Sequence, residues 1–198
     1  MRTHVVVDSP IGPLTLVAAD GQLTGLYMDA QRHRPGDEVV GAPGDPQAEP
    51  FASVADQLDA YFAGRLTEFD LPLAPAGTQF QRTVWAALRQ IPYGETWSYG
   101  QLASRIGNPA AVRAVGLANG RNPIAVVVPC HRVIGADGSL TGYGGGLERK
   151  RFLLDLESGA ARLPTDSRPN GSAGEPVGDH IPQVSHGLAE HLGQVRLT

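Results

Sequence analysis

Hydrophobic and polar residues alternate over the first 30 positions of the chain. Alternating runs at 3–9 and 13–19, followed by an apolar run at 23–29, predict three short strands. Proline and glycine at 10–13, and Asp-Gly at 20–21, supply turns between them. Short strands joined by tight turns are typical of an antiparallel meander. We therefore expect a small antiparallel sheet at the N-terminus.

A loop, a helix and a linker complete this N-terminal region. Residues 34–50 are acidic and rich in proline and glycine, so we expect a mobile loop there. Apolar residues recur on one helical face over 51–62, and Gly64 offers a stop. Leu, Pro, Ala and Gly at 71–77 indicate a linker. We therefore predict an N-terminal α/β domain at 1–77.

Beyond the linker the pattern becomes helical. Thr78 can cap a helix over 79–90, and Ser98 can cap a second helix over 99–106. A third helix is predicted over 109–118, with proline in its first turn. The second and third helices, joined by a Gly-Asn-Pro turn, form a candidate helix-turn-helix. Such helix pairs also occur in proteins that never touch DNA, so ordinary helix packing stays open as an alternative.

The predicted fold class is α/β (α+β) in two parts. The small N-terminal sheet with its helix is followed by a mainly helical domain at 78–160, which contains a (winged) helix-turn-helix and a short strand at 126–128. Residues 161–198 read as a low-complexity tail. The spacing of its three histidines fits no compact metal-binding motif, so we expect no metal there. These are His180, His186 and His191.

Charge is distributed unevenly, although the formal net charge is only -4. Residues 1–78 contain 4 basic and 11 acidic residues, whereas 79–162 contain 10 basic and 5 acidic ones, and nine of those ten cations are arginine. Arginine suits bidentate contacts with phosphate. The basic middle third therefore favours a nucleic-acid partner, with a solvated positive face as the common alternative.

The third predicted helix has an unusual surface. It consists of Ala, Val and Gly with a single arginine, Arg113. Small side chains let a helix backbone approach another surface closely, and one inserted arginine suits a narrow minor groove better than a major groove. Close packing against another helix explains the same composition equally well.

Cys130 is the only cysteine and a candidate nucleophile. It follows the apolar run 126–128 and Pro129, and His131 and Arg132 come directly after it. Nearby cations or a positioned base raise the thiolate fraction, and the thiolate is the attacking species. A lone buried cysteine can equally be an inert small hydrophobe. A single cysteine leaves no internal disulfide and no zinc site built from several thiolates.

The N-terminal sequence shows neither a signal peptide nor a membrane span, so we expect a cytoplasmic protein.

A series of short motifs between about 78 and 157 closely resembles the methylated-DNA-protein-cysteine methyltransferases, the O6-alkylguanine-DNA alkyltransferase family. The N-terminal part is similar more loosely, through the segments at 8–14 and 60–64. The C-terminal motifs are Tyr93-Gly94-Glu95-Thr96, Ser98-Tyr99, Gly107-Asn108-Pro109, Arg113-Ala114-Val115-Gly116, Arg121-Asn122-Pro123-Ile124, Pro129-Cys130-His131-Arg132-Val133 and Leu140-Thr141-Gly142-Tyr143-Gly144.

This resemblance implies a DNA repair protein that flips an alkylated base out of the duplex and transfers the alkyl group to its own cysteine, once and irreversibly. The expected substrates are O6-alkylguanine and O4-alkylthymine in double-stranded DNA. No cofactor is expected. We expect a monomer in solution, with several copies clustering on DNA.

By the same resemblance, four residues are catalytic. Cys130 accepts the alkyl group, and His131 takes the thiol proton through a water. Glu157 orients the imidazole, in the manner of a hydrolase triad. Asn122 ties the helix-turn-helix to the active-site strand.

The resemblance also implies groups that bind the base. The Tyr99 hydroxyl donates to guanine N3, and Tyr143 stacks on the base. The backbone carbonyls of Cys130 and Val133 receive the exocyclic amine. Position 144 is often polar in relatives but is Gly144 here, so a hydrogen bond to O6 would come from its N–H.

DNA contacts are expected from the third helix and from the segment next to the cysteine. Arg113 fills the space left by the flipped base, while Ala114 and Gly116 let the helix sit close. Arg132 is expected to contact DNA as well.

The run of three glycines at 144–146 suggests a loose loop and a wide pocket. Tolerance of bulky alkyl groups follows as a hypothesis. Two other functions remain open at this point. One is a lesion-binding helix-turn-helix protein without transfer, and the other is a cysteine hydrolase or peroxidase that turns over repeatedly.

Overall fold

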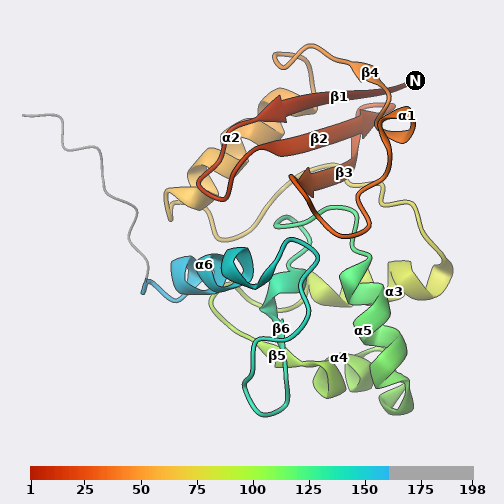
Figure 1. Ribbon diagram of the computed structural model, residues 1–198, viewed down its shortest axis with the longest axis vertical. Coiled ribbons are helices and arrows are strands. Elements are labelled where there is room, and N and C mark those ends of the chain that lie inside the picture. The colour runs from red at the N-terminus through yellow and green to blue at the C-terminus, as the bar shows by residue number, and fades with distance from the viewer. Residues whose placement is uncertain (161–198) are drawn as a thin grey trace, which may run out of the picture. The chain divides into compact units, whose positions relative to one another are not determined.

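The computed structural model describes residues 1–160; the tail at 161–198 and its three histidines lie outside the described residues. The N-terminal sheet has the strand order β3-β2-β1-β4 (Figure 1). Strands β1 (Arg2–Val7), β2 (Leu14–Ala19) and β3 (Gln22–Met28) pair antiparallel in sequence order. This arrangement confirms the predicted meander.

The segment at 34–50, predicted as a loop without elements, contains two short ones. Helix α1 (Asp37–Val40) is followed by β4 (Ala42–Pro43), which pairs parallel with β1. The side chain of Val40 is buried, and the N–H of Gly44 donates to the carbonyl of His4 at 2.8 Å. Proline and glycine content alone missed this because the partner strand lies more than 35 residues away in the sequence.

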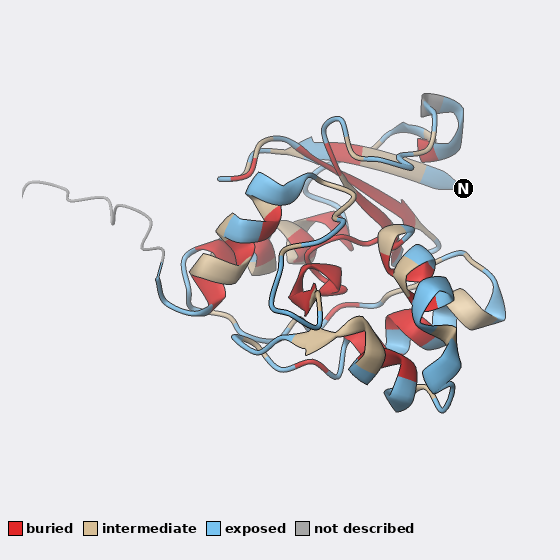
Figure 2. Cartoon of the chain, turned by 60° about the horizontal axis from the view of Figure 1, so that its bottom comes forward, coloured by how far each residue is buried: buried red, intermediate tan, exposed pale blue. Residues whose placement is uncertain are grey.

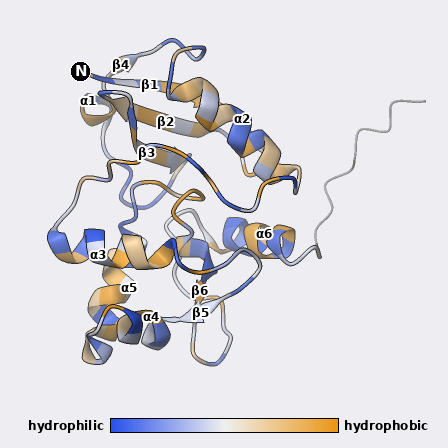
Figure 3. Cartoon of the chain, turned by 180° about the vertical axis from the view of Figure 1, so that it is seen from behind, coloured by the Kyte–Doolittle hydropathy of each residue, from blue (hydrophilic) through white to orange (hydrophobic). Residues whose placement is uncertain are grey.

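Helix α2 (Phe51–Phe62) covers one face of the sheet (Figures 1 and 3). Its bounds match the predicted helical face. Burying a large apolar side chain contributes roughly 1.5–3 kcal/mol relative to exposure, so this face fixes α2 on the sheet. The buried residues of α2 are Phe51, Val54, Leu58, Tyr61 and Phe62.

Between residues 78 and 160 the chain forms four α-helices, two of which begin with a reciprocal capping box. Thr78 caps α3 (Gln79–Leu88) and Ser98 caps α4 (Tyr99–Arg105), as predicted, and Gln81 and Gln101 complete the two capping boxes. A 3₁₀ turn at Pro109–Ala111 leads into α5 (Val112–Gly120). Helix α6 (Leu147–Glu157) completes the described chain. No helix within residues 1–160 is long and apolar enough to cross a membrane.

The run 126–128 is not the strand that its apolar residues predict. Val126 has φ +67°, and the Val128 N–H donates back to the Ile124 carbonyl at 2.9 Å, so the segment folds as buried turns. A 3₁₀ turn, Cys130–Arg132, follows. The strand comes after the cysteine, where β6 (Val133–Ile134) pairs parallel with β5 (Trp97–Ser98).

The outer strand β3 holds the chain just before this turn. The Leu26 N–H donates to the Pro123 carbonyl at 2.8 Å, and the Ala125 N–H donates to the Leu26 carbonyl at 3.1 Å. Buried residues of the sheet and of the helices form one continuous core (Figure 2). The N-terminal sheet therefore supports the segment that carries Cys130.

Candidate active site

Three side chains from two elements form a buried charged cluster next to the cysteine. His131 Nε2 lies 2.8 Å from Glu157 Oε1, and Arg132 binds both oxygens of Glu157 at 2.8 and 2.9 Å. All three residues are at most 6 % exposed. Because an ionised carboxylate only accepts, Nε2 carries the hydrogen and Nδ1 is the basic nitrogen of His131. The resemblance implied that Glu157 orients the imidazole of His131, and the structure places the two side chains in hydrogen-bond contact.

The cluster fixes which groups are charged. Burial alone would raise the pKa of Glu157, but hydrogen bonds from His131 and Arg132 outweigh burial and lower this pKa to about 2. Burial lowers the pKa of His131 despite its bond to Glu157. At neutral pH the cluster therefore contains an ionised carboxylate, a guanidinium and a neutral imidazole that can accept a proton.

This placement contradicts the expected contact between Arg132 and DNA. Its side chain is buried, and Nη1 donates to the Ile91 carbonyl at 2.7 Å while the other nitrogens bind Glu157. The basic composition around the cysteine suggested a phosphate contact. Instead, the guanidinium neutralises a buried carboxylate, because an unpaired buried charge is costly.

Asn122 touches the sulfur directly. Its Nδ2 lies 3.1 Å from Cys130 Sγ and 2.7 Å from the Val128 carbonyl, and its Oδ1 accepts from the Ile124 N–H at 3.0 Å. The amide thus ties the end of α5 to the buried turns before the cysteine. The predicted linking role matches this position.

Cys130 is a thiol, not a thiolate, in the free protein. Burial raises its pKa to about 11, although the Asn122 hydrogen bond and the nearby Lys150 ammonium lower it in part. The thiol is only 5 % exposed. Activation therefore needs a base that acts as the substrate reacts, and His131 is the adjacent one.

The two carbonyls expected to receive the exocyclic amine already accept protein hydrogen bonds. The Cys130 carbonyl accepts one hydrogen bond from the Val133 N–H and a second, at 3.4 Å, from Asn119 Nδ2. These two bonds occupy both lone pairs of the carbonyl oxygen. The Val133 carbonyl accepts from Lys150 Nζ at 2.6 Å and keeps one lone pair. Of the two, the Val133 carbonyl is the better placed acceptor.

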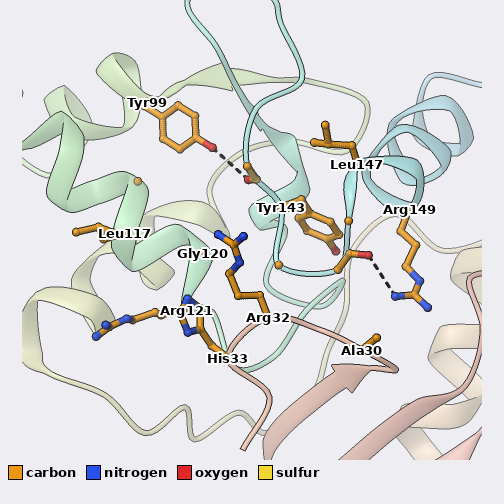
Figure 4. Close-up of a pocket in the computed structure, with 15 residues that line it drawn as sticks. Ala30, Arg32, His33, Tyr99, Leu117, Gly120, Arg121, Tyr143, Leu147 and Arg149 are labelled. Atoms are coloured by element: carbon orange, nitrogen blue, oxygen red, sulfur yellow. Dashed lines mark hydrogen bonds between the residues drawn. The ribbon is translucent and has the colours of Figure 1, made fainter.

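A pocket of about 910 Å³ lies at the residues expected to bind the base (Figure 4), and Cys130 and His131 are not among the residues that line it. Tyr99 at the start of α4, Leu117 of α5 and Tyr143 line it. Burial raises the pKa of the Tyr143 hydroxyl, and the neighbouring Cys130 raises this pKa further. Four lining residues can carry positive charge: Arg32, His33, Arg121 and Arg149.

The glycine loop at 144–146 is held in place by the N-terminal part of the chain. The Gly144 carbonyl accepts from the Arg32 N–H at 2.8 Å, and the Gly145 carbonyl accepts from Arg149 at 3.2 Å. A Cβ at Gly145 would collide with the sulfur of Met28. The expectation of a loose loop rested on glycine content alone and is wrong, because these contacts hold the loop in place.

Helix α5 presents the residues expected to meet DNA. Arg113 and Ala114 are exposed, and Leu117 is 70 % exposed. A Cβ at Gly116 would lie 3.7 Å from the ring of Tyr99, so a small residue here lets the tyrosine lie against α5. In Figure 3 the α5 ribbon is largely hydrophobic in colour. The Tyr99 hydroxyl lies 3.5 Å from the Gly142 carbonyl, too long for a strong bond.

Sequence reasoning missed several residues of the site. Tyr61 carried the signal of a core position on α2 and lies in the family-like segment 60–64, neither of which predicts a contact with Glu157, and Lys150 carried the signal of a surface cation on α6. Asn119 had no signal, since one amide on a helix predicts no contact with a particular carbonyl. Each reaches the site across at least ten positions of sequence.

Comparison with known proteins identifies the family of the chain. The family described as 6-O-methylguanine DNA methyltransferase, ribonuclease-like domain, matches residues 3–75, and the DNA binding domain of the same family matches 79–159. A methylated-DNA–protein-cysteine methyltransferase of Mycobacterium tuberculosis is 58 % identical over 166 residues, covering 84 % of this chain and 97 % of the relative. One of Methanosarcina acetivorans is 54 % identical over 155 residues, covering 78 % and 97 %.

Solved structures give the same result. The structure of Mycobacterium tuberculosis OGT in complex with DNA aligns with a TM-score of 0.73 at 58 % identity, covering 80 % of this chain and 94 % of that one. An O6-methylguanine DNA methyltransferase of Methanococcus jannaschii, at 24 % identity and a TM-score of 0.57, shares the fold. The chain belongs to the 6-O-methylguanine DNA methyltransferase family.

Proposed function

We propose that this protein repairs DNA by transferring an alkyl group from O6 of guanine to Cys130, and that each molecule reacts once. One observation carries the proposal: the sulfur of Cys130, the only cysteine, accepts a hydrogen bond from Asn122 at 3.1 Å, and the next residue, His131, is hydrogen-bonded to Glu157. Relatives named for this activity, and the DNA complex of one of them, support the reaction and the partner.

In the proposed reaction the thiol proton passes to His131 Nδ1, which is buried and has no protein partner within residues 1–160. The sulfur attacks the alkyl carbon, and the carbon–O6 bond breaks. The electron pair stays on the guanine, where a hydrogen bond from Tyr99 to N3 stabilises the charge. The proton on His131 balances that charge until guanine is neutralised.

The pocket suits an extruded nucleotide. Tyr143 offers an aromatic surface for the base, and within residues 1–160 the Gly144 N–H donates to no backbone carbonyl, so it is available for O6. The cations among the lining residues suit the phosphates on either side of a flipped base. Arg113, exposed on α5 with Ala114 beside it, would occupy the space left in the duplex.

Incubation with a duplex containing O6-methylguanine, followed by the intact mass of the protein and of its Cys130 peptide, tests the proposal. One methyl on Cys130 without further turnover is expected. Repeated turnover would favour a hydrolase or peroxidase, and binding without a mass change would favour a lesion-binding protein.

The pocket volume also bears on which adducts react. With its glycine loop held in place, a pocket of about 910 Å³ remains large for a purine with a methyl group. We therefore keep acceptance of bulkier groups as part of the proposal. Comparable single-turnover rates with O6-benzylguanine and O6-methylguanine in the same duplex would support it, and a strong preference for methyl would contradict it.

A further inference from the structure

One buried side chain of the N-terminal part reaches the catalytic cluster. The hydroxyl of Tyr61, on α2, lies 2.7 Å from Glu157 Oε1, although the two residues are 96 positions apart. The side chain of Tyr61 is fully buried. Burial and the neighbouring Glu157 raise the pKa of Tyr61, so its hydroxyl stays protonated and can only donate to the carboxylate.

The oxygen that Tyr61 binds is the one that orients His131. Glu157 Oε1 accepts from Tyr61, from His131 Nε2 at 2.8 Å and from Arg132 at 2.9 Å. Three donors on one carboxylate oxygen compete for its electron density. The bond from Tyr61 therefore weakens the attraction of this oxygen for the proton on His131.

We propose that Tyr61 is a positioning residue for alkyl transfer: its hydroxyl holds Glu157 in place and limits how strongly Glu157 retains a proton on His131. The N-terminal part of the chain would then help to set the basicity of the imidazole. This inference rests on the proposed function, because it assigns Tyr61 a role in that reaction.

An aromatic cluster fixes the tyrosine in this position. The Tyr61 ring meets Phe62 at 5.3 Å, Phe69 at 5.2 Å and Tyr93 at 6.1 Å between ring centroids. The guanidinium of Arg132 lies 5.7 Å from the centroid of the Tyr93 ring. A phenylalanine at position 61 keeps these ring contacts and removes only the hydroxyl, so the substitution isolates the hydrogen bond.

All charged or titratable groups around His131 must be considered before a pH effect is assigned. Glu157 and Lys150 face it from α6, Arg132 and Cys130 lie in its own turn, and Tyr61 comes from α2. Of these, only Tyr61 is altered by the Tyr61→Phe substitution. Without the hydroxyl, Glu157 stabilises the protonated imidazole more strongly, so the pKa of His131 rises.

The test measures the single-turnover rate with free O6-benzylguanine between pH 5 and pH 9 in the full chain. In Tyr61→Phe we expect the pH of half-maximal rate to rise by about one unit, because one donor to the carboxylate is lost. At pH values below the midpoint the rate then falls by up to about tenfold, and at pH values well above it the rate stays near that of the unaltered protein.

Tyr93→Phe is the matched control. Its ring lies in the same aromatic cluster, and its hydroxyl makes no hydrogen bond within residues 1–160, so the pH of half-maximal rate should not move. In a Glu157→Gln background, adding Tyr61→Phe should not shift the midpoint further, since the hydroxyl acts through the carboxylate. An equal fall in rate at every pH would show that Tyr61 is merely structural and would overturn the proposal.

A second substitution covers the case in which Tyr61→Phe does not fold. Difluorotyrosine placed at position 61 keeps the ring and donates a stronger hydrogen bond, so the midpoint should move to lower pH. No shift, or a shift to higher pH, contradicts the proposal. Alkylation of Cys130 in the unaltered protein is measured in parallel, so that a failure of the proposed function is recognised separately.

Discussion

The interior of the site and its rim are built in opposite ways. Around Glu157 the side chains of Tyr61, His131 and Arg132 are buried and hydrogen-bonded to it at 2.7 to 2.9 Å. At the rim, Arg113 and Leu117 are exposed, and the Tyr99 hydroxyl has only a long contact of 3.5 Å. Groups that move a proton need a fixed geometry and a shifted pKa, whereas groups that receive DNA need to adjust to it.

The largest effect is expected from breaking the interior at Glu157. Glu157→Gln should slow transfer about a thousandfold with duplex and with free base alike, because His131 loses the group that orients it. The protein should also lose about 3–5 kcal/mol of stability, since the charge of Arg132 is left unpaired in the interior. Single-turnover rates and thermal unfolding measure both effects.

Glu148→Gln, at an exposed position in the first turn of α6, is the control and should leave rate and stability unchanged. In Glu157→Gln, duplex repair could be lost while the free base still reacts normally. That result would show that the interior cluster serves DNA binding and would contradict the division between interior and rim.

Tyr99 lies between the two regions, and its removal should have an intermediate effect. Tyr99→Phe is expected to reduce transfer about tenfold to a hundredfold with both substrates, because the leaving guanine loses a hydrogen-bond donor. Rates at saturating substrate check this. A loss confined to duplex DNA would move Tyr99 to the rim and away from the chemistry.

The glycine loop offers a finer test of where the interior ends. In Gly145→Ala the new methyl group meets Met28, and stability should fall by about 1–3 kcal/mol. Gly144→Ala is the matched control, since its Cβ would lie 3.6 Å from its neighbours and fits without rearrangement. Thermal unfolding measures the difference, and equal effects of the two substitutions would contradict the packing described.

A further effect of the interior concerns stability in acid. Glu157 has its folded-state pKa lowered from 4.5 to about 2, so its contribution is present above pH 4.5 and is lost as the pH falls toward 2. The unaltered protein should lose stability over this range more steeply than Glu157→Gln. Urea unfolding at several pH values tests this, and parallel curves would contradict an ionised, paired Glu157.

The regular elements of the fold could be predicted from the sequence, because they depend on local patterns. The meander, helix α2 and the caps at Thr78 and Ser98 follow from alternation, helical spacing and side-chain type. The run 126–128 was wrongly predicted as a strand, since a short apolar run indicates burial without specifying the backbone.

The site could be predicted only in part. Cys130, His131, Asn122 and Glu157 followed from the resemblance, and the structure brings them together. Arg132 was wrongly assigned to DNA, because sequence gives its charge but not the buried carboxylate that it neutralises. Contacts such as that of Tyr61 depend on how the two parts of the chain pack, which no local pattern records.

Arg113→Ala provides the most direct test of the division between interior and rim. Transfer to Cys130 is followed by peptide mass spectrometry, with free O6-benzylguanine and with duplex containing the same base, and with the exposed Arg151→Ala as a control of equal charge. The rate with duplex should fall about tenfold to a hundredfold, because the unstacked base is no longer replaced, while the rate with the free base is unchanged. Equal losses with both substrates would contradict the account.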